Sequence, residues 1–320
     1  MKRNYFFSSA LPKCCADKLE DLFLSGRLVS KISLLGSQID RNTLSEHISH
    51  KNNLTCIDKI FVDSGAFAVH TGKAKSNVDE YIEYVNSMDD NVDYIAQFDT
   101  IPGTLGENKD AESYRRSSQL SWDNYLYMRE RLISPEKLVP VFHFGEDFSN
   151  LIRMLDYKDN NGMSIQLIGI SPANDTNYRT KQKYLDAVYD CIRTSSNPNA
   201  KTHLFGCTGL QNIAQYPYYS CDSISHRIRS GWGQLQTQRF GVISLSKKAS
   251  SEFPFQERCS KEDLKELENI ANYYGYTVDI LAEDYKARLV VDICETQKIF
   301  AQLCDASARR TQRRLFKIPR

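Results

Sequence analysis

IFVDSGAF, at residues 60–67, is a short apolar run that ends in an aspartate, a serine and a glycine. A second run, YYSCDS at residues 218–223, leads into Asp222 in a similar way. In α/β proteins the carboxyl end of a buried parallel strand opens into the mouth of the fold, where functional groups gather. The two runs therefore predict two strands that bring two carboxylates, Asp63 and Asp222, to one mouth.

Similar apolar runs recur along the chain, separated by segments with helical periodicity. Val78, Tyr81, Ile82 and Val85, for example, follow the spacing of one helix face. Strands are expected at residues 4–8, 32–35, 60–62, 94–98, 138–142, 165–170, 203–205, 218–221 and 240–244. Strand and helix alternate about eight times, which predicts an α/β fold of the (β/α)8 TIM-like barrel type. An open, doubly wound sheet is the alternative.

The length of the chain allows a barrel and a further segment. A barrel of this kind takes roughly 250 residues, so we expect a catalytic barrel over residues 1–258 and a C-terminal helical extension over residues 259–320. Ser260 starts a capping-box-like sequence and Gly275 suits the end of a helix. The last twelve residues, the basic tail, carry six positive charges and no negative one. Such a tail suits a phosphate backbone, or equally a solvated helix end.

Composition points to a globular protein, with 41% hydrophobic residues, 25% charged residues and a net charge of +1. No apolar run approaches the roughly 18 residues that a membrane helix needs, and the N-terminus does not resemble a signal peptide, so we expect a cytoplasmic protein without membrane contact. The nine cysteines are scattered, with no C-x-x-C spacing. Neither a metal site nor a nucleotide cofactor motif is present, and we expect no cofactor.

Polar and glycine residues collect at the ends of the expected strands. An aspartate there often only caps the next helix. For Asp63 the next helical pattern begins near Asn77, too far to be capped, whereas a helical turn over residues 223–229 keeps capping open for Asp222. His143 is equally consistent with a hydrogen-bonded core residue. The strand-end residues are Asp63, Ser64, Gly65, Asp99, His143, Gly145, Gly169, Ser171, Gly206 and Asp222.

Two opposed carboxylates suit chemistry at an anomeric carbon. One can attack C1′ to form a covalent glycosyl intermediate while the other manages the protons of the departing group. Glycines and aromatic residues around them would suit a planar base. The residues by themselves thus predict carboxylate-based group transfer in a barrel mouth.

These segments also resemble the tRNA-guanine transglycosylase superfamily. FVDSGAF at 61–67 resembles its D-S-G-G-F segment, Phe98-Asp99 its F-D element, and IGI at 168–170 its V-G-G strand end. The resemblance is closer to the DpdA-like DNA-guanine transglycosylases of phages and bacterial genomic islands. Their phrases P-V-F-H-Y-G-E, H-G-F-G-x-T and Y-P-x-Y-S-x-D-S are similar to residues 140–146, 203–208 and 216–223. The match extends over residues 55 to 235, in order.

The resemblance implies roles for the strand-end residues. Asp222 matches the nucleophile that expels guanine, and Asp63 matches the general acid/base. Asp99 would accept hydrogen bonds from N1 and the exocyclic amine of the base, and the strand end at Gly169 would offer backbone donors to its carbonyl. The remaining pocket residues would be Ser64, Gly65, Phe67, His143, Gly145, Ser171 and Gly206.

The resemblance also implies partners. The substrate would be DNA, and the incoming base a 7-deazaguanine of the preQ0 type. A homodimer or an accessory protein is possible, and a phage-encoded enzyme would act in the bacterial host cytoplasm. Contacts to nucleic acid are expected from Arg227, Arg309, Arg310, Arg313, Arg314 and Lys317.

Departures from the family pattern affect the choice of substrate. The tRNA enzymes carry a C-x-C-x-x-C…His zinc site, whereas here only Cys259, Cys294 and Cys304 follow the nucleophile block, widely spaced. This disfavours tRNA. Ala66 replaces the second glycine of D-S-G-G, and residues 28–56 have no match. The alternatives are a tRNA-guanine transglycosylase-like enzyme, a catalytically silent nucleic-acid-binding paralogue and a barrel glycosidase acting on free nucleosides.

Overall fold

The computed structural model describes residues 3–101, 110–172, 176–209, 214–246 and 254–315, without the side chains of 306–315. Its main sheet contains nine described parallel strands in the order β5-β4-β3-β2-β1-β9-β8-β7-β6. These are β1 (Asn4–Ser8), β2 (Ile32–Ser37), β3 (Ile57–Asp63), β4 (Tyr94–Ala96), β5 (Leu138–Val139), β6 (Val141–His143), β7 (Leu167–Ser171), β8 (Lys201–Leu204) and β9 (Ser220–Ser223).

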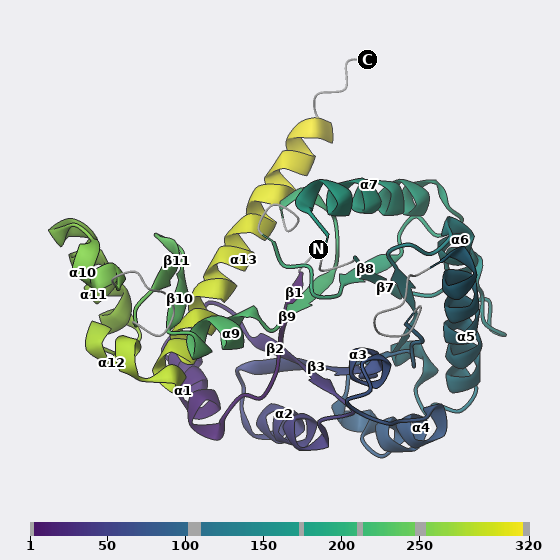
Figure 1. The fold of residues 1–320 in the computed structure, drawn as a ribbon, viewed down its shortest axis with the longest axis horizontal. Helices are drawn as coiled ribbons and strands as arrows, with labels where there is room; N and C mark the ends of the chain where they lie inside the picture. The colour runs from purple at the N-terminus through teal and green to yellow at the C-terminus, as the bar shows by residue number, and fades with distance from the viewer. Residues whose placement is uncertain (1–2, 102–109, 173–175, 210–213, 247–253, 316–320) are drawn as a thin grey trace.

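The sheet curves into a barrel because its two edge strands are consecutive parts of one stretch of chain. Only Pro140 separates β5 from β6. On one side the N–H of Gln97 donates to the Val139 carbonyl (2.9 Å), and on the other the N–H of Gly169 donates to the Pro140 carbonyl (2.8 Å). Proline has no N–H to donate in a sheet, so Pro140 divides this stretch of chain into the two short strands β5 and β6. The fold is thus the expected α/β TIM-like barrel, and the open-sheet alternative is excluded (Figure 1).

Helices surround the strands (Figure 1). Several start at Asx caps, as at Asp40, Asn77 and Asp147, whose side chains accept a hydrogen bond from a first-turn N–H. The helix around Val78–Asn86 buries Tyr81, Ile82 and Val85, as the periodicity predicts. The surrounding helices are α1 (Lys13–Leu24), α2 (Arg41–Asn53), α4 (Val78–Asn86), α5 (Ala111–Arg129), α6 (Phe148–Asp156) and α7 (Tyr178–Thr194).

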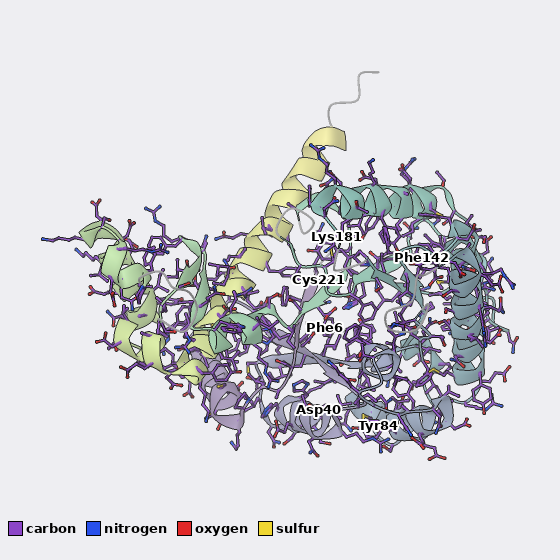
Figure 2. The ribbon with its side chains drawn as sticks, viewed as in Figure 1. Phe6, Asp40, Tyr84, Phe142, Lys181 and Cys221 are labelled. Carbon is purple, nitrogen blue, oxygen red and sulfur yellow. The ribbon has the colours of Figure 1, made fainter. Side chains whose placement is uncertain are left out.

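An apolar layer fills the barrel interior. Figure 2 shows Phe6 among the strands, whereas Tyr84 lies out among the helices. Strand side chains alternate between the two faces, so residues two positions beyond this layer point the same way, toward the mouth. Phe61 therefore sets the direction of Asp63, and Phe6 that of Ser8. The layer consists of Phe6, Leu35, Phe61, Ala96, Val139 and Leu167.

The C-terminal part contains a hairpin and helices. The run expected as a strand at 240–244 lies in a separate two-stranded antiparallel sheet of β10 (Gln234–Thr237) and β11 (Gly241–Ser244), so its expected place in the barrel is wrong. Ser260 does cap a helix, accepting a hydrogen bond from the Asp263 N–H, and Gly275 has a positive φ of 80°. The helices are α10 (Phe255–Arg258), α11 (Lys261–Tyr273), α12 (Val278–Glu283) and α13 (Tyr285–Leu315).

The long helix α13 connects this part to the barrel (Figure 1). Asp292 on α13 is fully buried and forms an ion pair with Arg229 at 2.6 Å. Arg229 lies on α9 (Ser225–Gly231), which follows β9. Phe300 on α13 packs edge-on against Tyr5 of β1, with ring centroids 5.5 Å apart. The boundary expected near residue 258 stays a prediction. None of the described helices combines the length and hydropathy that crossing a bilayer requires.

Candidate active site

Asp222 lies at the mouth of the barrel and accepts hydrogen bonds on both carboxylate oxygens. Its Oδ2 accepts from Ser8 Oγ at 2.8 Å, and its Oδ1 accepts from the Gly206 N–H at 2.9 Å. His203 Nε2 lies 3.3 Å from the same Oδ1. Asp222 does not cap the following helix, because α9 has Ile224 at its N-cap position. The capping alternative is therefore excluded for Asp222.

Asp63 has fewer partners. Its Oδ2 accepts the Gly65 N–H at 3.0 Å. Burial raises the pKa of Asp63 to about 7; the carboxylates of Asp99 and Asp222 add to the rise, and the Gly65 N–H opposes it. A carboxyl group with such a pKa can give and take a proton near neutral pH.

A short helix follows Asp63 closely. It is α3 (Ala66–His70), which is not expected from the sequence; the helix expected to begin near Asn77 is present as α4, with Asn77 at its N-cap. The N-cap of α3 is Gly65, and no side chain caps it. Asp63 therefore caps no helix. The reason is that Gly65 takes the N-cap position of α3, and not that the next helix is far away.

Asp99, His143 and Glu146 form a second polar group at the mouth. His143 Nε2 lies 3.2 Å from Asp99 Oδ2, and His143 Nδ1 lies 2.9 Å from Glu146 Oε1. Burial alone would lower the pKa of His143, but the two carboxylates raise it to about 10. His143 is therefore a cation at neutral pH.

One oxygen of this group has no partner. Asp99 Oδ1 is buried and makes no hydrogen bond among the described residues. Buried polar atoms nearly always have partners, and an exception requires an explanation such as a ligand. Asp99 Oδ1 can accept hydrogen bonds from a bound molecule.

Glycines allow close packing around the mouth. An added Cβ at Gly145 would lie 2.6 Å from the ring of Tyr114, and one at Gly169 would lie 2.5 Å from Phe205. Gly65 has a positive φ of 74° and lies against Ile39. The strand end at Gly169 is expected to offer backbone donors to a base; the N–H of Gly169 itself donates to the Pro140 carbonyl, so it is not one of them. The Gly206 N–H donates to Asp222.

Three other expected pocket residues are Ser64, just after β3, Ser171, at the end of β7, and Phe67, on α3. Ser64 is buried, and its Oγ has no hydrogen-bond partner among the described residues. Ser171 ends β7 and pairs in register with His143. Phe67, on α3, is 68% exposed, so its ring is available to a ligand but makes no closed pocket by itself.

The residues expected to contact nucleic acid are only partly described. Arg227 is exposed on α9, the helix that follows Asp222. Only the backbone, and not the side chains, is described for four arginines of α13: Arg309, Arg310, Arg313 and Arg314. Lys317 lies outside them altogether.

Sequence reasoning missed Ser8, His203 and Glu146 as site residues. Glu146 and His203 stand within the motif phrases at 140–146 and 203–208, which was a usable signal. His203 is fully buried, and the rings of Phe61 and Phe205 lie 4.7 and 4.4 Å from its own. For Ser8 no signal was available, because a serine at a strand end is common.

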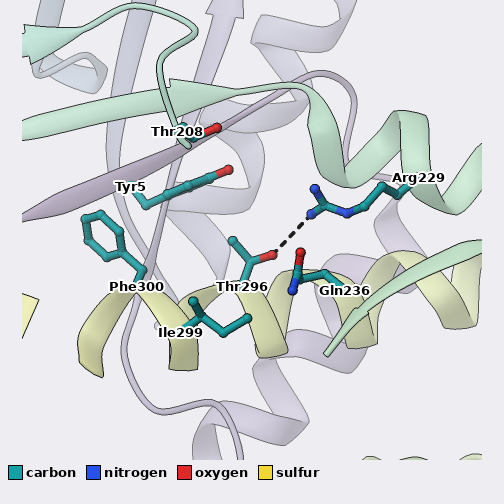
Figure 3. A pocket seen from close by; sticks show the side chains of 7 residues that line it. All are labelled: Tyr5, Thr208, Arg229, Gln236, Thr296, Ile299 and Phe300. Atoms are coloured by element: carbon teal, nitrogen blue, oxygen red, sulfur yellow. Dashed lines mark hydrogen bonds between the residues drawn. The ribbon is translucent and has the colours of Figure 1, made fainter. Parts of the chain in front are cut away.

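A small cavity lies behind the Asp222 strand, between β1, α9 and α13 (Figure 3). Its volume is about 50 Å³, and Figure 3 shows Arg229 donating to Thr296 beside it. The space suits water-sized occupants, and its lining includes none of the carboxylates or histidines at the mouth. No group of His, Cys, Asp and Glu residues in the described parts is arranged to hold a metal ion.

Together, fold and site define an α/β barrel with carboxylates and an imidazolium at its mouth. No family model and no curated protein sequence matches the chain. Among solved structures, it is similar to a probable tagatose 6 phosphate kinase from Sinorhizobium meliloti 1021. The identity is 10%, the TM-score is 0.42, and the match covers 98% of this chain and 93% of the other. A likeness at this level carries no argument about function.

Proposed function

We propose that the protein is a DNA-guanine transglycosylase, a pentosyltransferase that exchanges guanine in DNA for a 7-deazaguanine of the preQ0 type. The observation that carries this proposal is the contrast of two carboxyl groups at one mouth. Asp222 accepts three hydrogen bonds, as a positioned anion does, whereas burial raises the pKa of Asp63 to about 7. The substrate class follows from the resemblance over residues 55 to 235.

In the first half of the reaction, Asp222 attacks C1′ of the target deoxyribose. The bond from C1′ to N9 breaks, and its electron pair leaves with the guanine. Protonated Asp63 gives its proton to the departing base and becomes a carboxylate. The pKa of about 7 suits this step, because a substantial fraction of Asp63 is protonated at neutral pH.

The second half reverses these events with the new base. The Asp63 carboxylate takes the N9 proton of the 7-deazaguanine, and N9 attacks C1′. The electron pair of the ester bond returns to Asp222. Atoms and charges balance without a cofactor, and Asp63 regains the proton that it gave away.

Recognition of both bases would use the second polar group. Asp99 Oδ1, buried and without a partner among the described residues, would accept from N1–H and the exocyclic amine. The cationic His143 holds the other Asp99 oxygen at 3.2 Å and keeps that carboxylate in place. Guanine and a 7-deazaguanine share the same Watson–Crick edge, so one pocket would serve both.

The DNA would have to present its base outside the stack. Removing a base from a duplex costs a few kcal/mol, and contacts from Arg227 and the basic tail would contribute to the binding that offsets this cost. A homodimer or an accessory protein that opens the duplex belongs to the same proposal, as does a cytoplasmic location.

The test is base exchange with the purified full chain. Guanine-containing DNA, tRNA and a free nucleoside are each incubated with excess preQ0, and digested products are analysed by mass spectrometry. Denaturing gels show covalent protein–nucleic-acid adducts. Asp222→Ala is the inactive control, with Asp147→Asn as a matched change at the exposed N-cap of α6, where Asn caps as well as Asp.

We expect the deazaguanine in DNA, together with an adduct that Asp222→Ala abolishes. Product in tRNA alone would retain the chemistry and overturn the DNA assignment. Product from the free nucleoside alone would indicate a nucleoside glycosidase. If the chain binds DNA but forms neither an adduct nor a product with any of the three substrates, a catalytically silent binding paralogue is favoured.

A further inference from the structure

The two oxygens of Asp222 are not equivalent. Oδ1 accepts the Gly206 N–H at 2.9 Å and faces His203 Nε2 at 3.3 Å, whereas Oδ2 accepts only Ser8 Oγ, at 2.8 Å, among the described contacts. A carboxylate oxygen has about two lone-pair sites. Oδ1 is therefore fully occupied, and Oδ2 keeps one lone pair for a ligand.

The hydrogen-bond network assigns His203 as a donor to Oδ1. His203 Nδ1 lies 2.8 Å from Ser220 Oγ, whose hydroxyl can donate to it. The proton of the neutral ring is then on Nε2, the nitrogen that faces Asp222. The rings of Phe6, Phe61 and Phe205 surround the imidazole, with centroids between 4.4 and 5.7 Å away. His203 therefore cannot turn away from Oδ1 without repacking the barrel interior.

Ser8 is also held in place through its neighbour in the chain, Ser9. The next residue, Ser9, has a positive φ of 115°, which is unusual for a residue other than glycine. Two histidines hold Ser9 in place. His47 Nε2 lies 3.0 Å from the Ser9 carbonyl oxygen, and His226 Nε2 lies 3.5 Å from Ser9 Oγ. Strained backbone of this kind persists where the surroundings enforce it, commonly at functional sites.

We propose that Oδ2 of Asp222 is the atom that bonds to C1′, and that Ser8 is the positioning residue that aims this oxygen. The inference rests on the proposed transglycosylase function. In the first step a lone pair of Oδ2 forms the bond to C1′ while the C1′–N9 pair leaves with guanine. In the second step the new base attacks C1′, and the C1′–Oδ2 pair returns to Oδ2.

Ser8 affects the two steps differently. Its hydroxyl donates to an anionic Oδ2 before the first step and to a weakly accepting ester oxygen afterwards. Negative charge then returns to Oδ2 in the second step, and the Ser8 hydroxyl stabilises it. Removing this donor therefore slows release of the covalent intermediate more than its formation.

The experiment compares Ser8→Ala with wild type in single-turnover and steady-state exchange of preQ0 into a guanine-containing oligonucleotide. The readouts are the exchange rate and the fraction of enzyme trapped as adduct. Ser8→Cys is a second variant of similar size with a weak thiol donor. Ser118→Ala is the matched control, since it removes a buried hydroxyl on the outer helix α5, where Ser118 Oγ donates to the Arg115 carbonyl. Circular dichroism reports the fold of each variant.

We expect Ser8→Ala to slow exchange roughly 10- to 100-fold, the effect of losing one hydrogen bond to a charged group. The adduct fraction should rise at the same time, with Ser8→Cys between Ser8→Ala and wild type. A purely structural role would lower adduct and product together. That result, or wild-type exchange and adduct levels in either folded Ser8 variant, overturns the inference but leaves the proposed function standing. No exchange by wild type overturns the proposed function and this inference with it.

Discussion

Asp222 and Asp63 share one mouth, yet their surroundings are opposite. Asp222 ends β9 and accepts from a hydroxyl, a backbone N–H and an imidazole. Asp63 ends β3 and has one backbone donor, with two carboxylates near enough to raise its pKa. Donors stabilise a carboxylate, whereas burial and like charge favour the protonated acid. Two identical side chains are thus prepared for two tasks, one as an anion and one as a proton carrier.

The largest expected effect comes from Asp222→Asn. The amide keeps the shape of the side chain but is not a nucleophile, so exchange should fall by about 10⁴-fold or more, and no adduct should form. Adduct formation on denaturing gels is the measurement. An adduct that persists in Asp222→Asn would place the nucleophile elsewhere and end the comparison between the two aspartates.

Asp63→Asn should slow exchange by about 10²- to 10⁴-fold, the usual contribution of a general acid or base. In wild type, guanine release requires the protonated acid and falls as pH rises through about 7, where the pKa of Asp63 lies. Attack by the new base requires the carboxylate and falls as pH drops below that value. Rates of the two half-reactions against pH measure this. If the Asp63→Asn variant keeps the wild-type pH dependence of both half-reactions, Asp63 is not the group that transfers the proton.

The two aspartates should also differ in their effect on stability. Asp63 binds its proton more tightly when folded than unfolded, where its pKa is about 3.9. Ionising the buried Asp63 carboxyl group therefore lowers the free energy of unfolding. This cost is absent below about pH 4, grows as the pH rises toward 7 and is constant above that, at on the order of 4 kcal/mol at most. Asp63→Asn should therefore stabilise the fold at pH 8, and the gain should vanish near pH 4.

Asp222→Asn should destabilise the fold, because it removes a carboxylate that accepts from three donors. We expect a loss of about 1–3 kcal/mol at pH 8. Thermal or urea unfolding of both variants at several pH values measures the contrast, and it needs no substrate. Equal effects of the two substitutions would show that their surroundings do not differ in the way described.

A smaller change tests what raises the pKa of Asp63. Asp99→Asn removes a neighbouring negative charge, so the pKa of Asp63 should move down, toward its ordinary value. The pH midpoint of guanine release should shift to lower pH. Asp147→Asn, at the exposed cap of α6, is the control and should leave the midpoint in place. An unchanged midpoint in Asp99→Asn would exclude Asp99 as a cause and leave burial and the Asp222 carboxylate.

The strand ends could be predicted from sequence because each is a short apolar run followed by polar and glycine residues. This located Asp63, Asp99, His143 and Asp222 at or just after the ends of separate strands, and barrel geometry places His143 Nε2 3.2 Å from Asp99 Oδ2. The run at 240–244 was misplaced because a hairpin strand and a barrel strand have the same apolar pattern. Periodicity reports which face is buried, not which sheet buries it.

Other features could not be predicted, because they depend on contacts between distant residues. The hydrogen bond from Ser8 to Asp222 joins residues 214 positions apart. The N–H of Gly169 donates to the Pro140 carbonyl, a pairing that only the register of the sheet determines. The short helix α3 has only five residues, too few to show a period. Local patterns contain none of these facts.

The single long helix α13 has a mechanical consequence. It is held to the barrel at Asp292 and again at Phe300, which packs against Tyr5, and the arginines of the basic tail begin at Arg309 on the same continuous helix. At 1.5 Å per residue, Arg309 stands roughly 13 Å beyond Phe300, and Figure 1 shows the helix extending past α7 beyond the ring of strands. For the proposed DNA substrate, such a helix would set a distance of about four base pairs, at 3.4 Å each, between the barrel wall and the first arginine of the tail.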